Sequence, residues 1–399
     1  MRRRRQEEIK MKVCMLNPFF LPYQGGTEKH VWEVGRRLVK KGFEVTVLTT
    51  LLPGTAPREE IDGIVVERVG ALMVLDKLPP YSPVPPPIAV VPAMSQKIEE
   101  KAKENEILHI HNRFFYSPED AKKVKRKGAK LCITLHNART VGISPATDFF
   151  GTLYDEVRGQ KIMENCDAIA AVSTNTREVT VPKRLWGKAR TIYNGVNAEF
   201  FNPKNSGEKM RKELGLQDEK MVLTVCRLAE QKGLKYLIEA AKKFSGEHEA
   251  KLVILGVGSQ EEELRELAKK LGVENKVVFV NRKVPEEDLA GLYAACDVFA
   301  LASTWEPFGM AICEAMSTAK PVVATTAGGI PEIVTPETGF LVEPKNADQM
   351  ASKIGELLAD GETARKMGLA GRKRVEENFT WDHTTDRYEK MYFEVMEKE

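Results

Sequence analysis

KVCMLNPFFLPYQGGTEKHVWEVGRRLVKKGFEVTVLTT, residues 12–50, is the stretch that decides the fold. Its first residues, 12–16, are apolar after Lys12 and predict a buried strand, and residues 44–50 predict a second strand. Between them, Gly25 and Gly26 predict a turn that opens a helix. A strand, a helix and a second strand in this order predict two parallel strands joined by a helical crossover.

The helix of this unit has recognisable ends and one apolar face. Thr27 is expected to cap its start, and Gly42 is expected to stop it just after Lys41. Apolar residues recur at the spacing of one helical face, namely Val31, Val34 and Leu38. We expect this face to pack on the sheet.

Short β-branched runs alternate with amphipathic helices along the rest of the chain. In the first half, further strands are expected at residues 64–69, 107–111, 130–136 and 168–173. In the second half they are expected at residues 221–226, 251–255, 277–280, 298–301, 321–324 and 339–342. This alternation predicts an α/β protein whose parallel sheets are covered by helices on both faces.

The chain is expected to form two domains. Its 399 residues exceed what one hydrophobic core usually supports. Turn residues interrupt the α/β alternation around 194–197, so we place the division between an N-terminal domain of residues 1–200 and a C-terminal domain of residues 201–379. The final segment, 380–399, is expected to be a helix long enough to cross back onto the first domain.

The composition excludes some classes of protein. Lys and Arg total 60 against 57 Asp and Glu, without the basic excess typical of nucleic-acid binding. The six cysteines form no CxxC pair, which predicts free thiols in a cytoplasmic protein. No apolar run reaches the length of a membrane span. The basic residues Arg2–Arg5 and the basic stretch 122–130 leave weak contact with an anionic membrane surface as an alternative to solvated charges.

The polar clusters of this chain fall where strands end, which is where open parallel sheets bind ligands. Arg227 and Lys232 follow one expected strand and precede a helix. Cations at a helix start oppose the helix dipole, so this pair calls for an anion, and a diphosphate would suit both side chains. A pair of solvated charges is the plainer alternative.

A second cluster follows a later strand. Glu306 precedes a helix expected to begin near Phe308, where the backbone N–H groups of Gly309 and Met310 are open to an anion. Glu314 lies about two turns into this helix. A carboxylate accepts from two adjacent hydroxyls, so one glutamate is expected to meet a sugar and the other a ribose diol. The alternative is a helix-start carboxylate and a surface residue.

Histidines end two strands of the first half. His109 and His111 share one face of their strand by alternation, and His136 ends another strand. We expect His109 to be a core histidine and His111, nearer the crevice, to be a site residue. Zinc is the less favoured interpretation, because no third ligand has motif spacing.

Two negative observations concern cofactors. The Gly25-Gly26 turn lacks the GxGxxG spacing of a dinucleotide fold and the GK[ST] of a P-loop, so by itself it is a weak phosphate signal. No Asp-x-Asp occurs, so the usual carboxylate pair for a metal–diphosphate donor is missing. We therefore expect no metal and no cofactor, and a diphosphate would have to be met by protein cations and helix N-termini.

Together these segments resemble the retaining glycosyltransferases of family 4 (glycosyl transferases group 1), over nearly the whole chain. The resemblance is most specific in Glu306 and Glu314 at their spacing, followed by residues 320–325 and by Gly328-Gly329-Ile330-Pro331-Glu332. It implies a GT-B fold, in which two Rossmann-like doubly wound domains face each other across a cleft.

The resemblance also implies residue roles. Glu314 would hold the ribose, Glu306 would contact the donor sugar, and His111 would lie beside the reacting sugar. The implied catalytic residues are His111, Glu306, Arg227 and Lys232. The implied donor-binding residues are Gly25, Gly26, Arg227, Lys232, Val280, Arg282, Glu306, Phe308, Gly309, Met310 and Glu314. Cys226, Asn281 and Ala319 stand where the family commonly has glycine, which puts loop geometry and base selection near Val280 in doubt.

The implied reaction moves a hexosyl group from a nucleotide-diphosphate sugar, with uridine slightly preferred over guanosine, to a hydroxyl of a glycan, a lipid-linked sugar or a small polar molecule. The departing phosphate would take the acceptor's proton. A nucleotide-sugar epimerase and a non-catalytic binding protein are the alternatives, although His111 and both glutamates count against the latter. Arg113, Arg139 and Arg158 could meet an acidic acceptor, or be ordinary surface arginines.

Overall fold

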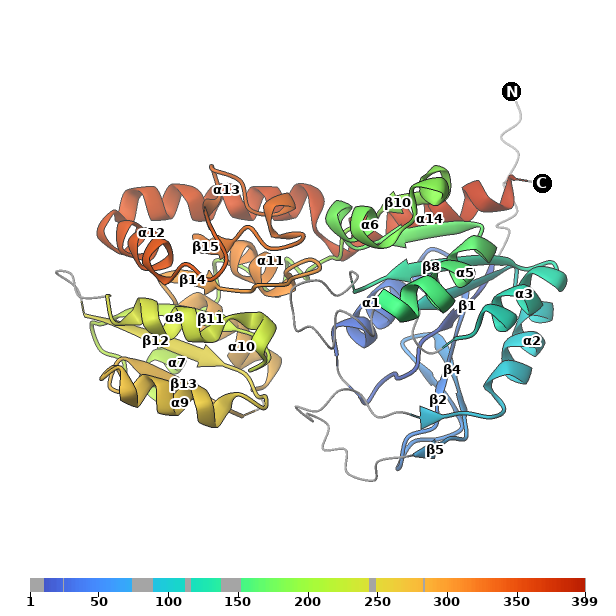
Figure 1. Ribbon diagram of the computed structural model, residues 1–399, viewed down its shortest axis with the longest axis horizontal. Coiled ribbons are helices and arrows are strands. Elements are labelled where there is room, and N and C mark those ends of the chain that lie inside the picture. Colours follow the sequence, from blue (N-terminus) through green and yellow to red (C-terminus); the bar gives the residue numbers. More distant parts are fainter. Residues whose placement is uncertain are drawn as a thin grey trace.

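The computed structural model describes residues 11–23, 25–73, 89–111, 116–137, 152–243, 249–282 and 284–398. Two α/β domains lie side by side (Figure 1), and each is built on a mainly parallel sheet. The predicted fold class is confirmed. Arg2–Arg5, Arg113 and Arg139 lie outside the described residues. Among the helices that are described, none is long and apolar enough to span a membrane.

The sheet of the first domain has the strand order β10-β9-β8-β7-β1-β2-β4-β3. Its strands are β1 (Lys12–Leu16), β2 (Glu44–Thr50), β3 (Arg58–Ile61), β4 (Ile64–Val69), β7 (Ile107–His111), β8 (Lys130–Leu135), β9 (Ala168–Ala171) and β10 (Ala189–Thr191). All pairs are parallel except β3 with β4. Strands β5 (Leu72–Met73) and β6 (Ala89–Val90) form a separate antiparallel pair.

Helices cover both faces of this sheet, because successive strand residues point to opposite sides. Val13 and Met15 pack with α1 (Gly26–Lys40), while Cys14 and Leu16 belong to the core on the other face. That other face is covered by α2 (Met94–Glu104), α3 (Pro118–Arg126) and α5 (Gln160–Asn165). Three further helical segments are α6 (Thr174–Thr180), the π-helix η2 (Asp155–Gly159) and the 3₁₀ helix η3 (Lys183–Lys188).

The sheet of the second domain is fully parallel, with the order β13-β12-β11-β14-β15-β16. This is the 3-2-1-4-5-6 order of doubly wound nucleotide-binding folds. Its strands are β11 (Lys220–Val225), β12 (Ala250–Leu255), β13 (Val277–Val280), β14 (Val298–Leu301), β15 (Val322–Thr325) and β16 (Gly339–Val342). One face carries α7 (Glu208–Glu213), α10 (Glu286–Ala295), α11 (Met310–Ser317) and α13 (Gly361–Asn378). The other carries α8 (Leu234–Ala241), α9 (Glu261–Lys270) and α12 (Ala347–Ala359).

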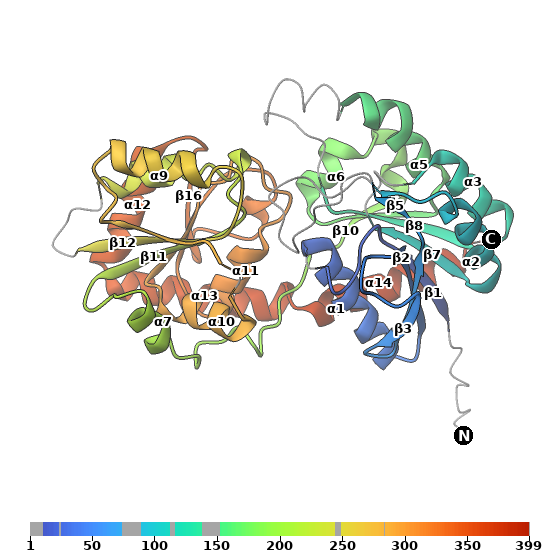
Figure 2. The ribbon, with the colours of Figure 1, turned by 90° about the horizontal axis from the view of Figure 1, so that it is seen from below.

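The last helix, α14 (Trp381–Met396), returns to the first domain, as predicted. Figure 2 shows α13 along the second domain and α14, drawn in red, continuing behind the first. The side chains of α14 that enter the first core are buried: Trp381, Tyr388, Met391, Tyr392 and Val395. The five apolar residues on one helical face explain this packing.

Three local predictions were wrong. Thr27 does not cap α1: the N-cap is Gly25, without a side-chain hydrogen bond, and the helix already begins at Gly26. The helix expected near Phe308 begins at Met310. The short strands β3 and β10 were not expected. The sequence of β3 is Arg-Glu-Glu-Ile, which has no apolar period, and its first three residues are exposed edge positions.

Candidate active site

Each of the two large sheets has one point at which its strand order reverses. Several of the predicted site residues come directly after the strands that flank this point. In the second sheet the reversal lies between β11 and β14, which are direct neighbours. Arg227 follows β11, and Glu306 follows β14. In the first sheet the reversal lies between β1 and β7, where the Gly25-Gly26 turn and His111 follow. Crevices at such switch points are where doubly wound sheets bind their ligands.

Lys232 and Glu306 form an ion pair across the switch point of the second sheet. The Lys232 ammonium lies 2.6 Å from a Glu306 carboxylate oxygen, and both side chains are largely buried. Lys232 ends the 3₁₀ helix η4 (Glu230–Lys232), and Gly233 follows it at φ 61°. A side chain at Gly233 would meet the Ala302 carbonyl oxygen at 2.1 Å, so this glycine allows the two loops to touch. Lys232 and Glu306 were expected to meet different parts of a donor. In this structure their opposite charges also neutralise each other.

The backbone behind Glu306 is held by a second glycine turn. The Glu306 carbonyl accepts from the Gly329 N–H at 2.9 Å. Gly328 has φ 56°, and a side chain there would meet the same carbonyl oxygen at 2.1 Å. The hydroxyl of Ser303 lies 3.3 Å from the Glu306 carboxylate. Lys232 and Ser303 thus meet the same carboxylate oxygen, and the glycine turn holds the backbone behind it.

Arg227 is exposed beside this pair and close to the first domain. The positive charge of Arg227 lowers the pKa of Tyr23, although burial raises that pKa more. Tyr23 precedes the Gly25-Gly26 turn of the first domain. The guanidinium is therefore close enough to Tyr23 to act on it electrostatically, and its exposed fork of N–H donors can bind an anion.

Glu314 is buried in the second turn of α11. One of its carboxylate oxygens accepts from the Tyr293 hydroxyl at 2.7 Å, and the other lies 3.9 Å from the ammonium of Lys29. Burial raises the pKa of Glu314, and Lys29 and the Tyr293 hydroxyl partly oppose this. Lys29 belongs to α1 of the first domain, so this carboxylate is shared between the domains.

At the start of α11, the groups that could contact a ligand are backbone groups rather than side chains. Gly309 is its N-cap at φ 119°, a conformation that favours glycine. The ring of Phe308 is buried and packs against Tyr193 and Phe379, so the side chain predicted to bind the donor belongs to the core. Met310 packs between the cores of the two domains.

The Gly25-Gly26 turn is accompanied by a buried acid that the sequence analysis did not single out. A side chain at Gly25 would meet the Glu28 carboxylate at 2.4 Å, whereas one at Gly26 would meet nothing within 4 Å. Burial raises the pKa of Glu28 to about 7, while a weak hydrogen bond from Asn17 lowers it. Gly26 is thus the open side of this turn.

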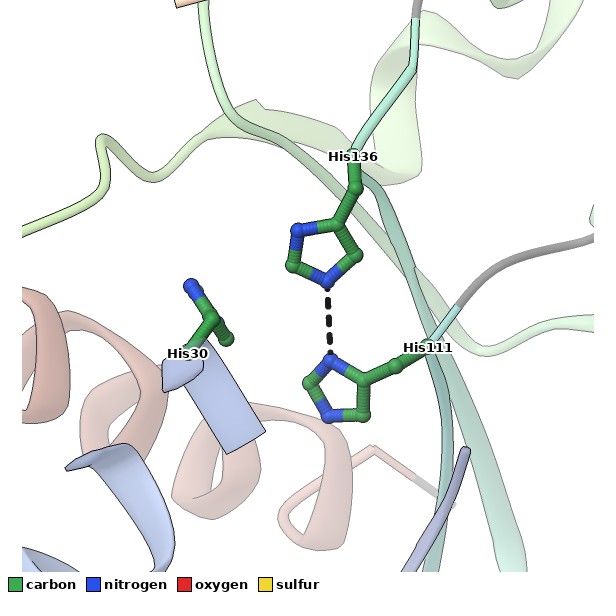
Figure 3. Close-up of side chains that lie close together, drawn as sticks. All are labelled: His30, His111 and His136. Carbon is green, nitrogen blue, oxygen red and sulfur yellow. Dashed lines mark hydrogen bonds between the residues drawn. The ribbon is translucent and has the colours of Figure 1, made fainter. Parts of the chain in front are cut away.

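The two histidines of β7 have the different surroundings that were predicted. His109 bonds at both ring nitrogens, to Tyr392 at 2.6 Å and to Thr134 at 2.8 Å, as a satisfied core histidine does. His111 is buried at the end of the strand, and its Nδ1 lies 3.1 Å from Nε2 of His136 (Figure 3). Burial holds the pKa of His111 well below its usual value, so the ring is neutral.

A cavity of about 340 Å³ lies at the carboxyl end of β13. Val280 and Arg282, both predicted to bind the donor, line it together with residues of α7 and α10. The guanidinium of Arg282 lies 3.2 Å from the carboxylate of Glu213 on α7. Like Arg227 and Glu306, the cavity lies at the carboxyl ends of the parallel strands. Its strand, β13, is two strands away from β11 at the switch point.

Several residues of the site were not predicted. Two helices supply these residues: α1 carries Glu28 and Lys29, and α10 carries Tyr293. Nothing in the sequence of either helix marked these positions as part of a site. His30, on α1, joins His111 and His136 (Figure 3). The only local signal for Glu28 and His30 was their nearness to the Gly25-Gly26 turn. Arg158 lies in the π-helix η2 and is exposed.

Comparison with known proteins agrees with this architecture. The glycosyltransferase family 4 profile matches residues 24–200, and the glycosyl transferases group 1 profile matches residues 206–374. An uncharacterized glycosyltransferase of Methanocaldococcus jannaschii is 37% identical over 240 residues, which cover 59% of this chain and 61% of that protein. The N-acetyl-alpha-D-glucosaminyl L-malate synthase of Bacillus anthracis is 27% identical over 94% of this chain and 95% of its own.

Solved structures share the fold over nearly the whole chain. The sucrose-phosphate synthase of Thermosynechococcus elongatus has a TM-score of 0.77 at 23% identity, and covers 97% of this chain and 99% of its own. HepE of Anabaena, in complex with UDP-glucose, has a TM-score of 0.74 at 22% identity, and covers 96% of this chain and all of its own. The two profiles, the two doubly wound sheets and the polar and charged residues that follow the switch points lead to one conclusion: the chain belongs to the family 4, group 1 glycosyltransferases, enzymes of the GT-B fold.

Proposed function

We propose that the protein is a retaining hexosyltransferase that takes its sugar from a nucleotide-diphosphate donor, passes it to an acceptor hydroxyl and needs no metal ion. The observation that carries this proposal is the meeting of four groups at one edge of the second sheet. Arg227 and Lys232 supply positive charge, Glu306 lies 2.6 Å from Lys232, and Glu314 is buried in α11, the helix that follows Glu306. The neutral His111 ends β7 at the switch point of the first sheet.

In this proposal the diphosphate binds between Arg227 and the turn at Gly26, and the backbone at Gly309 adds a helix N-terminus. These donors stabilise the negative charge that grows on the leaving diphosphate. When the diphosphate approaches Lys232, it competes with Glu306 for the ammonium, which frees the carboxylate for the sugar. The departing phosphate then takes the acceptor's proton.

The cavity at Val280 and Arg282 is the proposed site of the base. Uridine is the preferred base in the proposal, and the structure of HepE with UDP-glucose supports this choice by fold likeness. A GDP-mannose-dependent mannosyltransferase of Corynebacterium glutamicum, 35% identical over 204 residues, supports guanosine instead. A thermal-shift panel of nucleotide sugars decides between them, because a bound donor stabilises the folded state by mass action.

The test of the whole proposal is transfer from the selected donor in the presence of EDTA. We expect turnover to persist and the anomeric configuration of the product to match that of the donor, as read by NMR. Activity that disappears in EDTA and returns with manganese or magnesium would contradict the metal-free site. A donor that is only epimerised, without an acceptor, would point to the epimerase alternative.

Weak contact with an anionic membrane surface is a further part of the proposal. It is supported by Lys122, Lys125 and Arg126, which are exposed on α3, whereas Lys127 is paired with Glu99 at 3.0 Å. Each basic residue near an anionic surface contributes about 1 kcal/mol. Co-sedimentation with anionic vesicles at low salt tests it, and a protein that stays in the supernatant contradicts it.

A further inference from the structure

Three histidines from three separate elements converge beside the switch point of the first sheet. His30 comes from α1, His111 from the end of β7, and His136 directly follows β8. One ring nitrogen of each lies within 4.8 Å of the other two. Figure 3 shows the three rings around a common space, and the cluster consists of histidines.

The hydrogen bonds leave unshared electron pairs on these rings. Nδ1 of His30 lies 2.8 Å from Oδ1 of Asn194, an amide oxygen that can only accept, so Nδ1 carries the proton. Nε2 of His30 then has a free electron pair, and it is buried without a partner. Nε2 of His111 is also buried without a partner, but the nitrogen of that ring that lies beside His136 is Nδ1. An orphaned buried nitrogen is costly, so Nε2 of His30 calls for a ligand at this place.

The spacing of the rings is close to that of a metal site. Nδ1 of His111 and Nε2 of His136 are 3.1 Å apart. Two nitrogens bound to one tetrahedral zinc ion at 2.0–2.1 Å lie about 3.3 Å apart. The three nitrogens lie within 4.8 Å of one another, so a movement of His30 by about 1.5 Å or less would bring all three to this separation.

The surroundings also resemble those of metal-binding histidines. Such rings usually donate their other N–H to an oxygen that fixes their orientation, as His30 does to Asn194. The rings of Trp381 and Tyr388 from α14 pack edge-on against His30, with centroids 5.5 Å away in both cases, and shield it from solvent. His136 is less deeply buried than His30 and His111, which are fully buried.

We propose that His30, His111 and His136 form a site for a borderline transition-metal dication such as Zn²⁺, with a fourth coordination position open, and that its occupation inhibits sugar transfer. Three imidazoles suit zinc, copper or nickel and not magnesium or manganese, which prefer oxygen ligands. The site is therefore different from a metal–diphosphate site. The inhibition rests on the proposed function, because a bound ion would take the electron pair of His111 away from the reacting sugar.

The binding test is a titration of the purified full-length protein with Zn²⁺ against a chromophoric zinc indicator. We expect one ion per chain in the wild type. The His136→Gln and His30→Gln variants should bind it at least 10- to 100-fold more weakly, since loss of a direct ligand costs no less than loss of a supporting residue. His383→Gln is the matched control, because His383 lies on α14 and bonds Thr380. It should bind zinc as the wild type does.

The wild type also provides a test that does not depend on any variant folding. Co²⁺ in place of zinc should give the visible absorption of a tetrahedral site with nitrogen ligands. A strong near-ultraviolet band would instead indicate cysteine thiolates, of which the chain has six candidates. Such a band, or zinc binding that is unchanged in both histidine variants, would overturn the proposed site.

Inhibition is measured as the ratio of each protein's own rate with and without Zn²⁺. We expect the wild type and His383→Gln to lose activity and to regain it in EDTA, and His136→Gln to be insensitive at the same zinc concentration. Zinc that binds at the three histidines without inhibiting would overturn the inhibitory part alone. A protein without transferase activity would contradict the proposed function, while the binding titration would still decide the metal site.

Discussion

Glu306 and Glu314 are two carboxylates of one short segment with different surroundings. Glu306 accepts from a positive charge, the Lys232 ammonium, at 2.6 Å. Glu314 accepts from the neutral Tyr293 hydroxyl, and burial raises its pKa. A carboxylate held by a neutral donor in a buried place is suited to permanent hydroxyl contacts. One held by an exchangeable ammonium is suited to a contact that changes during the reaction.

We therefore expect the two glutamates to affect different steps. Glu314→Ala should weaken the binding of the free nucleotide diphosphate as well as that of the intact donor, because the ribose hydroxyls lose the carboxylate that accepts their hydrogen bonds. A lost hydrogen bond to a charged group costs about 1.5–3 kcal/mol, or about 10- to 100-fold in affinity. Calorimetry with the nucleotide measures this. Glu286→Ala is the control, because Glu286 also pairs with Lys29 but is exposed.

Glu306→Gln should instead lower kcat by about 100-fold, as removal of one group that stabilises transition-state charge does. The variant should bind the free nucleotide diphosphate no more weakly than the wild type does, because Lys232 would lose its partner and become available to the phosphates. Steady-state kinetics and calorimetry on the same preparation separate the two effects. Loss of nucleotide binding in Glu306→Gln, with normal binding in Glu314→Ala, would show that the roles are reversed.

Glu28 should make stability depend on pH. Burial raises its folded pKa from 4.5 to about 7, so the folded state binds more protons than the unfolded state between these values. Stability from this group is therefore present below pH 4.5 and lost as the pH rises towards 7, by on the order of 3 kcal/mol. Glu28→Gln carries no charge and should remove this loss.

The measurement is urea unfolding of the wild type and Glu28→Gln at pH 5 and at pH 8. The free energy of unfolding of the variant, relative to the wild type, should be higher at pH 8 than at pH 5. All other groups are common to both proteins and cancel in this difference. An equal difference at the two pH values would show that Glu28 has an ordinary pKa.

At the scale of elements, the two chain segments that join the domains lie directly against each other. The turn at Asn194-Gly195-Val196-Asn197 leads from the first domain to the second, and residues 379–381 return between α13 and α14. The Val196 N–H donates to the Phe379 carbonyl at 2.8 Å. Gly195 lies so close to Trp381 that a side chain would meet its backbone nitrogen at 2.3 Å. The two segments can therefore approach this closely only because residue 195 is a glycine.

Gly195→Ala should destabilise the protein by about 1–3 kcal/mol, the usual cost of forcing an extra carbon into a packed place. The neighbour is backbone and cannot rotate away. Thermal unfolding measures the effect. Gly187→Ala is the control, since a side chain there meets nothing within 4 Å and should change the melting temperature little. Equal melting temperatures for the two variants would contradict the packing of this crossing.

At the scale of the whole molecule, side chains of each domain bind the other across the cleft. Lys29 of the first domain pairs with Glu286 at 3.5 Å and lies 3.9 Å from Glu314 of the second. Glu332 of the second domain accepts from the backbone N–H groups of Thr174 and Asn175, at 2.7 and 2.8 Å. These contacts stabilise the present arrangement of the two domains.

Glu332→Ala should loosen this arrangement. The N–H groups at the start of α6 lose a charged acceptor, and hydrogen bonds of this kind contribute about 1.5–3 kcal/mol. Small-angle X-ray scattering should show a larger radius of gyration than for the wild type, and the far-UV circular dichroism should be unchanged. Glu337→Ala, an exposed position in the same domain, is the control. A scattering curve identical to that of the wild type would mean that other contacts hold the domains.

Much of this molecule was determined by the sequence alone. Apolar period and turn residues act over a few neighbours, so the strands, most helix positions and the return of α14 were predicted from them. The places of Arg227, Glu306 and His111 also followed, because charged and polar residues directly after buried strands are a local signal. Helix starts were less well predicted, because Gly25 and Gly309 begin helices through backbone conformation, without a capping side chain.

Only the tertiary structure decided which of these groups meet. The ion pair of Lys232 with Glu306, the approach of Lys29 to Glu314, and the convergence of His30 with His111 and His136 join residues far apart in the chain. Such meetings depend on the order of strands in each sheet and on how the two domains face each other. No local period or motif spacing encodes these distances, because they result from the packing of whole elements.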